Sequence, residues 1–201
     1  MNQFVFVRNK VIHGFGRGSR ELGCPTANIA GIQHLTIPTG IYCGLVQLII
    51  HNRDQIQVEP KNPQVHEKIS QRLPYVSKVQ GMVASFGYNP QFGNKERSLE
   101  VHILEDFGFN FYGAELRVLL CKKMRDEEKY SSLEELKKAI ARDIENAKIE
   151  VQNYAEFKTK PEYFQEENVA KPNEMKVAFN AQVNACRLKR FRDFEREGNT
   201  I

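Results

Sequence analysis

Residues 13–29, HGFGRGSRELGCPTANI, concentrate groups that can bind an anion. The segment holds three alternate glycines and two arginines: Gly14, Gly16, Gly18, Arg17 and Arg20. Glycine allows close approach of the backbone, and successive free N–H groups in such a loop form a concavity suited to phosphate. The spacing matches neither a Walker A loop nor a G-x-G-x-x-G fingerprint. From the glycines alone, a tight turn between strands is an equally good interpretation.

The same segment ends in Pro-Thr-Ala-Asn, residues 25–28. Thr26 and Asn28 are two positions apart, so on an extended backbone both side chains point to the same face. Each offers a neutral oxygen, and Mg²⁺ takes oxygen ligands from both protein and phosphate. The two residues are therefore candidate Mg²⁺ ligands. By spacing alone, a turn stabilised by side-chain hydrogen bonds explains them better.

Glu100 is the candidate for proton transfer. It alternates with apolar neighbours in the stretch 97–107, RSLEVHILEDF, and shares its face with His102. A carboxylate at such a position usually points to solvent. If it lines a site, it can accept a proton from a substrate hydroxyl.

Five short segments predict the strands that must position these residues. They are rich in Val, Ile, Leu and Phe, and Gly, Pro or Asn residues separate them. The segments are residues 4–14, 40–50, 81–88, 97–107 and 114–124. Several short strands with this punctuation predict an antiparallel barrel or sandwich.

A long amphipathic helix follows the strands. Apolar residues recur at gaps of three and four over residues 133–154. The preceding run SSLEE, residues 131–135, has the pattern of an N-terminal capping box. We expect the apolar face of this helix to pack on the core.

Two segments are interpreted as additions. Residues 51–80 contain three prolines, no glycine and mixed charges, and they lie between two expected strands. We expect them to form a long hairpin connection that is surface-exposed and dispensable for the chemistry. Residues 158–201 are polar, and the basic run RLKRFR at 187–192 is better explained as a solvated helix face or a disordered end than as a nucleic-acid or membrane contact.

Composition limits the function classes. The 201 residues carry a net charge of +4, with 41% hydrophobic and 27% charged residues. This charge suits an anionic ligand but not a coat for nucleic acid. The cysteines are Cys24, Cys43, Cys121 and Cys186. Their wide spacing argues against a disulfide framework or a zinc site and favours a reducing compartment.

Targeting signals are not evident either. No apolar run approaches the roughly 18 residues of a membrane span. The first residues, MNQFVFVRNK, lack the apolar stretch and cleavage site of a signal peptide. We therefore expect a cytoplasmic enzyme or binding module without a membrane or nucleic-acid partner.

Taken together, the segments resemble the riboflavin kinase family. The resemblance rests on five stretches in the family's order, at residues 14–29, 38–48, 86–104, 109–118 and 124–148. With residues 51–80 set aside, it covers approximately residues 5–165, and the Pro-Thr-Ala-Asn and Ser-Leu-Glu-x-His-Ile elements together are specific. It implies a mainly β fold: a six-stranded antiparallel Greek-key barrel with a long C-terminal helix. The expected organisation is a barrel and helix at 1–165, with an inserted loop at 51–80, and a polar, basic extension at 166–201.

The resemblance also implies an activity, the ATP- and Mg²⁺-dependent phosphorylation of riboflavin at its 5′-hydroxyl to give FMN. Glu100 inherits the role of catalytic base. The implied Mg²⁺ ligands are Thr26 and Asn28. The implied nucleotide contacts are Gly14, Arg20, Thr26, Ile103, Glu105 and Tyr112. The implied flavin contacts are Arg125, Glu128 and Tyr130.

The chain departs from the family pattern in the stretch that borders the flavin. Residues 124–130 read MRDEEKY, where the family usually has Leu-Arg-Pro-Glu-Lys-x-Phe. The proline is lost and Glu128 replaces a basic residue, so the role of Glu128 is the weakest of those carried over. Cys24 stands where an aliphatic residue is common, which we interpret as a packing change.

The sequence also bears on domain fusion, on oligomeric state and on other possible functions. Few residues precede Phe4, so we expect kinase activity without a fused adenylyltransferase, and we expect a monomer. The main alternative is a non-catalytic flavin-binding barrel, which would have no need of Thr26, Asn28 and Glu100 together. A nucleic-acid-binding barrel is a weaker alternative, because the chain has no tryptophan and only a mild positive charge.

Overall fold

The structure is a computed structural model that describes residues 4–14, 22–57, 63–90, 93 and 95–158. The strands are β1 (Val5–Ile12), β2 (Ala27–Ile29), β3 (Gly40–Ile50), β4 (Tyr75–Val76), β5 (Gln80–Gly87), β6 (Ser98–Ile103) and β7 (Glu115–Arg125). The helices are η1 (Arg53–Gln55), α2 (Pro63–Ser70), α3 (Leu133–Glu150), η2 (Val151–Tyr154) and α4 (Ala155–Lys158). The basic run at 187–192, the proposed extension at 166–201 and most of the glycine-rich segment lie outside the described residues.

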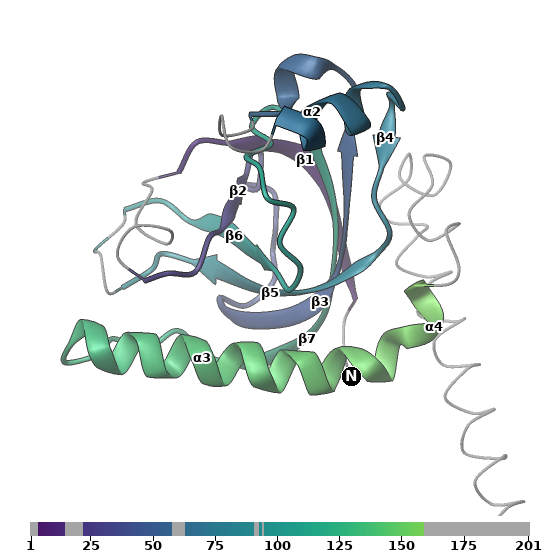
Figure 1. Cartoon of the computed structure of the whole chain (residues 1–201). Helices are drawn as coiled ribbons and strands as arrows, with labels where there is room; N and C mark the ends of the chain where they lie inside the picture. The colour runs from purple at the N-terminus through teal and green to yellow at the C-terminus, as the bar shows by residue number, and fades with distance from the viewer. Residues whose placement is uncertain (1–3, 15–21, 58–62, 91–92, 94, 159–201) are drawn as a thin grey trace, which may run out of the picture.

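Six strands close into an antiparallel barrel (Figure 1). Their order is β3-β5-β6-β2-β1-β7, and pairing of β3 with β7 closes the ring. The short β4 adds to the outer end of β3, where Ile50 pairs with Tyr75. This confirms the six-stranded antiparallel barrel that the family resemblance implies, and all five strands expected from the sequence pattern are present.

The sixth barrel strand, β2, was not expected from the sequence pattern. It has only three residues, and it lies between β1 and β6 within the Pro-Thr-Ala-Asn element. Three residues give too short a stretch for a period of two to stand out from a turn. This strand places the candidate Mg²⁺ ligands beside the strand that carries Glu100.

Apolar side chains form one core inside the barrel and a second core beneath α3. Along β3, Leu48 and Ile50 belong to the inner core, whereas Cys43 and Leu45 point outward into the second core. All four are fully buried. Because successive residues of a strand face opposite sides, a strand covered on both faces gives a continuous apolar run instead of an alternating one. This explains the sequence GLVQLII.

Helix α3 crosses the outside of the barrel and packs mainly on β5 and β3 (Figure 1). Ser132 is its N-cap and accepts a hydrogen bond from the backbone N–H of Glu135 at 3.2 Å. The carboxylate of Glu135 in turn accepts from the hydroxyl and N–H of Ser131, so the predicted capping pattern forms with both serines. No helix within the described part of the chain combines the length and hydropathy needed to cross a bilayer.

The connection between β3 and β5 is more deeply packed than its composition indicates. It contains η1, α2 and β4 and lies over one end of the barrel (Figure 1). Ile56 and Ile69 are only 5% and 8% exposed and belong to the inner core cluster. The expectation that residues 51–80 are wholly surface-exposed is therefore wrong, because the connection closes the barrel end with apolar side chains.

Candidate active site

The pairing of β2 with β6 brings together the two candidate Mg²⁺ ligands and the candidate base. Asn28 pairs with Glu100 across the two strands, and Ala27 pairs with Val101. Since Ala27 and Val101 are buried in the inner core, Asn28 and Glu100 stand on the outer face. Thr26, two residues before Asn28, donates its hydroxyl to Glu100 Oε2 at 3.4 Å. The three side chains singled out from the sequence therefore form one cluster.

Glu100 has two further donors around its carboxylate. Ser98 Oγ lies 3.3 Å from Oε1, and Asn89 Nδ2 lies 3.4 Å from the same oxygen. All these contacts are at the long end of the hydrogen-bonding range. The carboxylate is therefore oriented by weak contacts and keeps the capacity to accept a proton from a bound hydroxyl.

Gly14 lies directly against the side chain of Asn28. A Cβ atom built on Gly14 would lie 2.1 Å from Asn28 Nδ2, well inside any van der Waals contact. A side chain at position 14 would therefore displace the end of the Asn28 side chain, and glycine leaves room for that amide. Arg20, the other residue of the segment with an expected nucleotide role, lies outside the described residues.

Cys24 lies close to the same cluster but is not a reactive group. Burial, with a smaller contribution from the Glu100 carboxylate, raises the pKa of the Cys24 thiol to about 11. A neutral thiol is a poor nucleophile. This agrees with the interpretation of Cys24 as a packing residue. Within the described residues, Cys24, Cys43 and Cys121 are free and buried.

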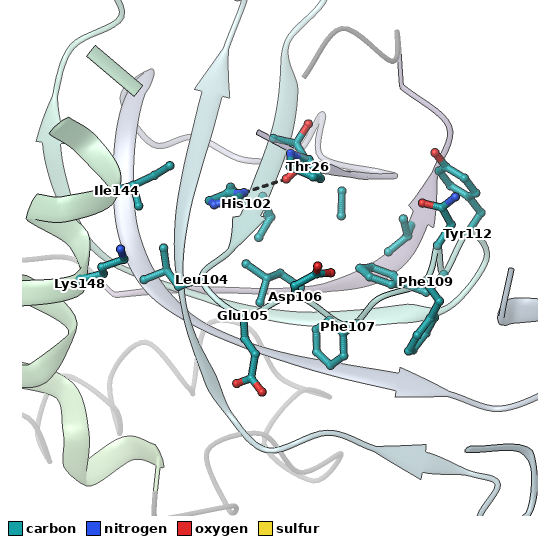
Figure 2. A pocket seen from close by; sticks show the side chains of 17 residues that line it. Thr26, His102, Leu104, Glu105, Asp106, Phe107, Phe109, Tyr112, Ile144 and Lys148 are labelled. Carbon is teal, nitrogen blue, oxygen red and sulfur yellow. Dashed lines mark hydrogen bonds between the residues drawn. The ribbon is translucent and has the colours of Figure 1, made fainter. Parts of the chain in front are cut away.

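A pocket of about 370 Å³ opens beside Thr26 (Figure 2). Four residues with an expected nucleotide role line it: Thr26, Ile103, Glu105 and Tyr112. In Figure 2 the carboxylate of Glu105 extends away from Thr26 and His102. The pocket also reaches α3, from which Ile144 and Lys148 contribute.

One wall of the pocket is aromatic, and the sequence analysis missed it. Phe107, Phe109 and Phe111 pack against one another with ring centroids 5.7–6.1 Å apart, mostly edge to face. Tyr112 continues this wall, and its ring stacks on His13 at 3.6 Å between centroids. The signal that could have revealed the wall is the alternation of phenylalanines in FGFNFYG, residues 107–113.

His102 connects the base-bearing strand to the Pro-Thr-Ala-Asn element. Its Nδ1 lies 2.8 Å from the carbonyl oxygen of Pro25, to which it can only donate (Figure 2). The sequence placed His102 on the same face as Glu100 and gave it no partner. In the structure it fixes the backbone that carries Thr26.

The three residues expected to border the flavin also lie together. The Cζ atom of Arg125 is 5.9 Å from the ring centroid of Tyr130, and the Tyr130 hydroxyl donates to Glu128 at 3.0 Å. Arg125 is anchored to α3 by two hydrogen bonds to the carboxylate of Asp143, at 2.9 and 2.6 Å. Burial lowers the pKa of Arg125, but the bonds to Asp143 outweigh it and the pKa is raised overall.

Glu127, which no sequence prediction singled out, connects the stretch expected to border the flavin to the candidate base Glu100 through Asn89. Its carboxylate accepts the backbone N–H groups of Tyr88 and Asn89, at 3.2 and 2.8 Å. A Cβ on Gly87 would lie 2.0 Å from the same carboxylate, so the glycine makes room for it. Asn89, held in this way with φ of 51°, donates to Glu100.

The fold and site together define a class. Oxygen donors, a carboxylate and a pocket beside a glycine-bearing segment are the groups that phosphoryl transfer to a hydroxyl requires. The family model described as riboflavin kinase (flavokinase) matches residues 1–151. The chain belongs to the riboflavin kinase family.

Individual relatives agree with this membership. A riboflavin kinase of Pyricularia oryzae is 43% identical over 147 residues, 71% of this chain and 68% of the relative. The riboflavin kinase of Homo sapiens is 35% identical over 163 residues, 79% of this chain and 88% of the relative. The crystal structure of riboflavin kinase from Trypanosoma brucei superposes with a TM-score of 0.58 at 23% identity, covering 82% of this chain and 91% of that one. The last comparison supports the fold.

Proposed function

We propose that the chain carries out the reaction of its family, transfer of the γ-phosphoryl group of ATP to the 5′-hydroxyl of riboflavin, at the cluster formed by Thr26, Asn28 and Glu100. The observation that carries this proposal is the β2–β6 register, which sets Asn28 opposite Glu100 on the outer face. Thr26 joins them through its hydroxyl. A passive flavin binder would not require these three groups beside a nucleotide-sized pocket.

Glu100 acts as the base in this scheme. As the 5′-oxygen of riboflavin attacks the γ-phosphorus, the carboxylate takes the hydroxyl proton. A P–O bond to the ribityl oxygen forms while the bond between the γ-phosphorus and the β,γ-bridging oxygen breaks. ADP leaves with that oxygen, and FMN remains. The weak contacts of Ser98 and Asn89 hold the carboxylate in place without neutralising it.

Mg²⁺ fits the side chains at this cluster. Thr26 and Asn28 offer two neutral oxygens on one face, and these are ligands of the kind that the ion takes alongside phosphate. The amide of Asn28 occupies the space that a Cβ at position 14 would fill, so its place depends on Gly14. When bound there, Mg²⁺ would neutralise charge on the transferred phosphoryl group.

The substrates would approach from two sides of the cluster. The nucleotide would occupy the pocket lined by Thr26, Ile103 and Tyr112. Gly14 and Arg20 would have the nucleotide-contact role that the family resemblance implies. Riboflavin would lie beside Arg125, Glu128 and Tyr130, which are gathered at the end of β7. Glu105 lines the same pocket, although its carboxylate extends away from Thr26.

The test is direct. The full chain is incubated with riboflavin, ATP and Mg²⁺, and flavins are separated by chromatography while ADP is assayed. We expect FMN and ADP in equal amounts, and no FMN when Mg²⁺ is removed by a chelator. Riboflavin binding without FMN formation would overturn the proposal in favour of a non-catalytic flavin-binding barrel, an alternative that family membership does not favour.

The domain organisation and the cellular setting are part of the proposal. Residues 1–165 would form the catalytic unit, and a chain ending at residue 165 should keep its turnover. The buried free thiols Cys24, Cys43 and Cys121 suit the reducing cytoplasm. We expect a monomer that binds no nucleic acid, which size-exclusion chromatography with light scattering and a filter-binding assay with RNA would check.

A further inference from the structure

The connection between β3 and β5 reaches into the site through a set of hydrogen bonds. Gln57 and Asn110 exchange both backbone hydrogen bonds, at 2.8 and 2.9 Å. The Gln57 side-chain oxygen also accepts the backbone N–H of Tyr112 at 3.0 Å. Gln55 Nε2 donates to the carbonyl of Gly113 at 2.8 Å. The connection between β3 and β5 therefore pairs with the stretch that builds the aromatic wall of the pocket.

We infer that Gln55 and Gln57 are positioning residues that hold the aromatic wall of the nucleotide pocket in its binding geometry. The inference rests on the proposed function, because it takes the pocket beside Thr26 as the nucleotide site. The two glutamines do not touch the nucleotide. They act through the backbone of Tyr112 and Gly113, and so they set the affinity for ATP.

The side-chain amide of Gln57 is used at both ends. Its Nε2 donates to the carbonyl of Asp54 at 2.6 Å while its oxygen serves Tyr112. The amide offers a donor and an acceptor and so makes both contacts, whereas an ionised carboxylate or an apolar chain cannot. Gln57 is thereby fixed to its own turn and to the pocket wall at once.

Gln55 repeats this arrangement two residues earlier. Its oxygen accepts the N–H groups of His51 and Asn52, at 2.7 and 3.3 Å, and its Nε2 reaches Gly113. Both side chains therefore close the turn around η1 and connect it to the same four-residue stretch, 110–113. Two side-chain amides that each hydrogen-bond to the backbone of this stretch argue that they position it.

Tyr112 connects the stretch held by the two glutamines to the residue before Gly14. Its ring lines the pocket (Figure 2). The same ring stacks on His13, the residue before Gly14. Displacement of the Tyr112 backbone would therefore disturb the aromatic wall and the start of the glycine-rich segment together. Tyr112 and Gly14 are both expected contacts of the nucleotide and neither is an expected contact of the flavin, so the effect should fall on ATP.

The buried Ile56, between the two glutamines, decides how this is tested. It is 5% exposed in the inner core cluster, so deletion of the whole connection would disturb folding and say nothing about positioning. Single side-chain changes are cleaner. The variants are Gln57→Leu, Gln57→Glu and Gln55→Leu. Gln71→Leu is the matched control, because Gln71 is exposed on the same connection and its side chain donates to the carboxylate of Glu67.

The measurements separate ATP from riboflavin. For each full-length variant, KM values for MgATP and riboflavin are determined, and ADP binding is measured by calorimetry without turnover. For Gln57→Leu and Gln55→Leu we expect KM for MgATP and Kd for ADP to rise by about three- to tenfold, as when one ordering hydrogen bond is lost. KM for riboflavin should stay within about twofold in the same variants, and Gln71→Leu should change neither constant, since surface changes are usually small.

Gln57→Glu keeps an acceptor for the Tyr112 N–H but loses the donor to Asp54, so it should recover part of the ADP affinity. Equal ADP affinity in both leucine variants and the control would overturn the inference, as would an equal loss of riboflavin and ADP affinity. If a leucine variant fails to fold, Gln57→Glu is compared with the control Gln71→Leu. ADP binding that is tenfold weaker in the glutamate variant than in the control would show that the hydrogen bond from the Tyr112 N–H does not control the affinity. A wild-type chain that makes no FMN and binds no ADP would instead remove the proposed function.

Discussion

Asn28 on β2 lies directly across from Glu100 on β6, and both side chains stand on the outer face of the barrel. The register is set by their buried neighbours, because a slip by one residue would turn Ala27 and Val101 out of the core. Hydrophobic burial of Ala27 and Val101 therefore fixes the position of the two polar groups. The cluster can be tested one group at a time.

The first prediction concerns the proton. Glu100→Gln keeps the size of the side chain and most of its contacts with Thr26 and Ser98, but the amide cannot accept the hydroxyl proton. Turnover should fall by about 10²- to 10⁴-fold, the usual contribution of a positioned general base. MgATP and riboflavin should bind within a few-fold of wild type, measured by calorimetry and by quenching of flavin fluorescence. Turnover within about threefold of wild type would show that Glu100 is not the base.

The second prediction concerns the metal. Thr26→Ala and Asn28→Ala each remove one oxygen donor, so each variant should require a higher Mg²⁺ concentration for half-maximal turnover, by about tenfold. Riboflavin binding should not change. Thr36→Ala, at an exposed position outside the cluster, is the control. An unchanged Mg²⁺ requirement in both variants would remove these residues as ligands.

The strands and the face on which Glu100 stands were predictable because their signals are local. Glu100 alternates with Leu99 and Val101, and burial of those two residues confirms the face that alternation assigned to it. The contacts of Gln57 and Glu127 were not predictable in the same way. Gln57 and its partner Tyr112 are 55 positions apart in the sequence, and Glu127 is 39 and 38 positions from Tyr88 and Asn89. The partners are backbone N–H groups, which carry no sequence signature.

The inserted connection shows a second limit of composition. Charge and proline content indicated an exposed loop, yet Ile56 and Ile69 fill the end of the barrel. Two apolar residues in a polar stretch have no period by which their burial could be recognised. For this reason the expectation that residues 51–80 are dispensable gives way to the test of Gln55 and Gln57.

The third prediction concerns Glu127. Glu127→Ala removes the acceptor for the N–H groups of Tyr88 and Asn89, so Asn89 should lose its place beside Glu100. We expect turnover to fall by about tenfold, because two backbone hydrogen bonds to a charged group are lost. Glu127→Gln retains an acceptor oxygen and should recover part of the turnover. Glu134→Ala, on an exposed part of α3, serves as the control.

A positioning role of Glu127 is distinguished from a merely structural one by the coupling between the effects of Glu127 and Asn89 variants on turnover. If Glu127 acts by holding Asn89, then Asn89→Ala should lower turnover, and the double variant should be little worse than Glu127→Ala alone. Additive losses, or a loss that falls entirely on the melting temperature, would contradict a positioning role.

The last prediction uses the contact between Gly14 and Asn28. A methyl group at position 14 would lie 2.1 Å from Asn28 Nδ2, and the end of a side chain can move where backbone cannot. Gly14→Ala should therefore leave the fold intact, with a melting temperature close to wild type, while it displaces the amide and raises the Mg²⁺ requirement. In the Asn28→Ala variant the added methyl group has space, so Gly14→Ala should raise the Mg²⁺ requirement little further there. The strong non-additivity expected for residues in contact is then the signature of the site, measured as Mg²⁺-dependent turnover in the two single variants and the double variant. Independent, additive losses would mean that Gly14 acts on the nucleotide alone and that the place of Asn28 does not depend on it.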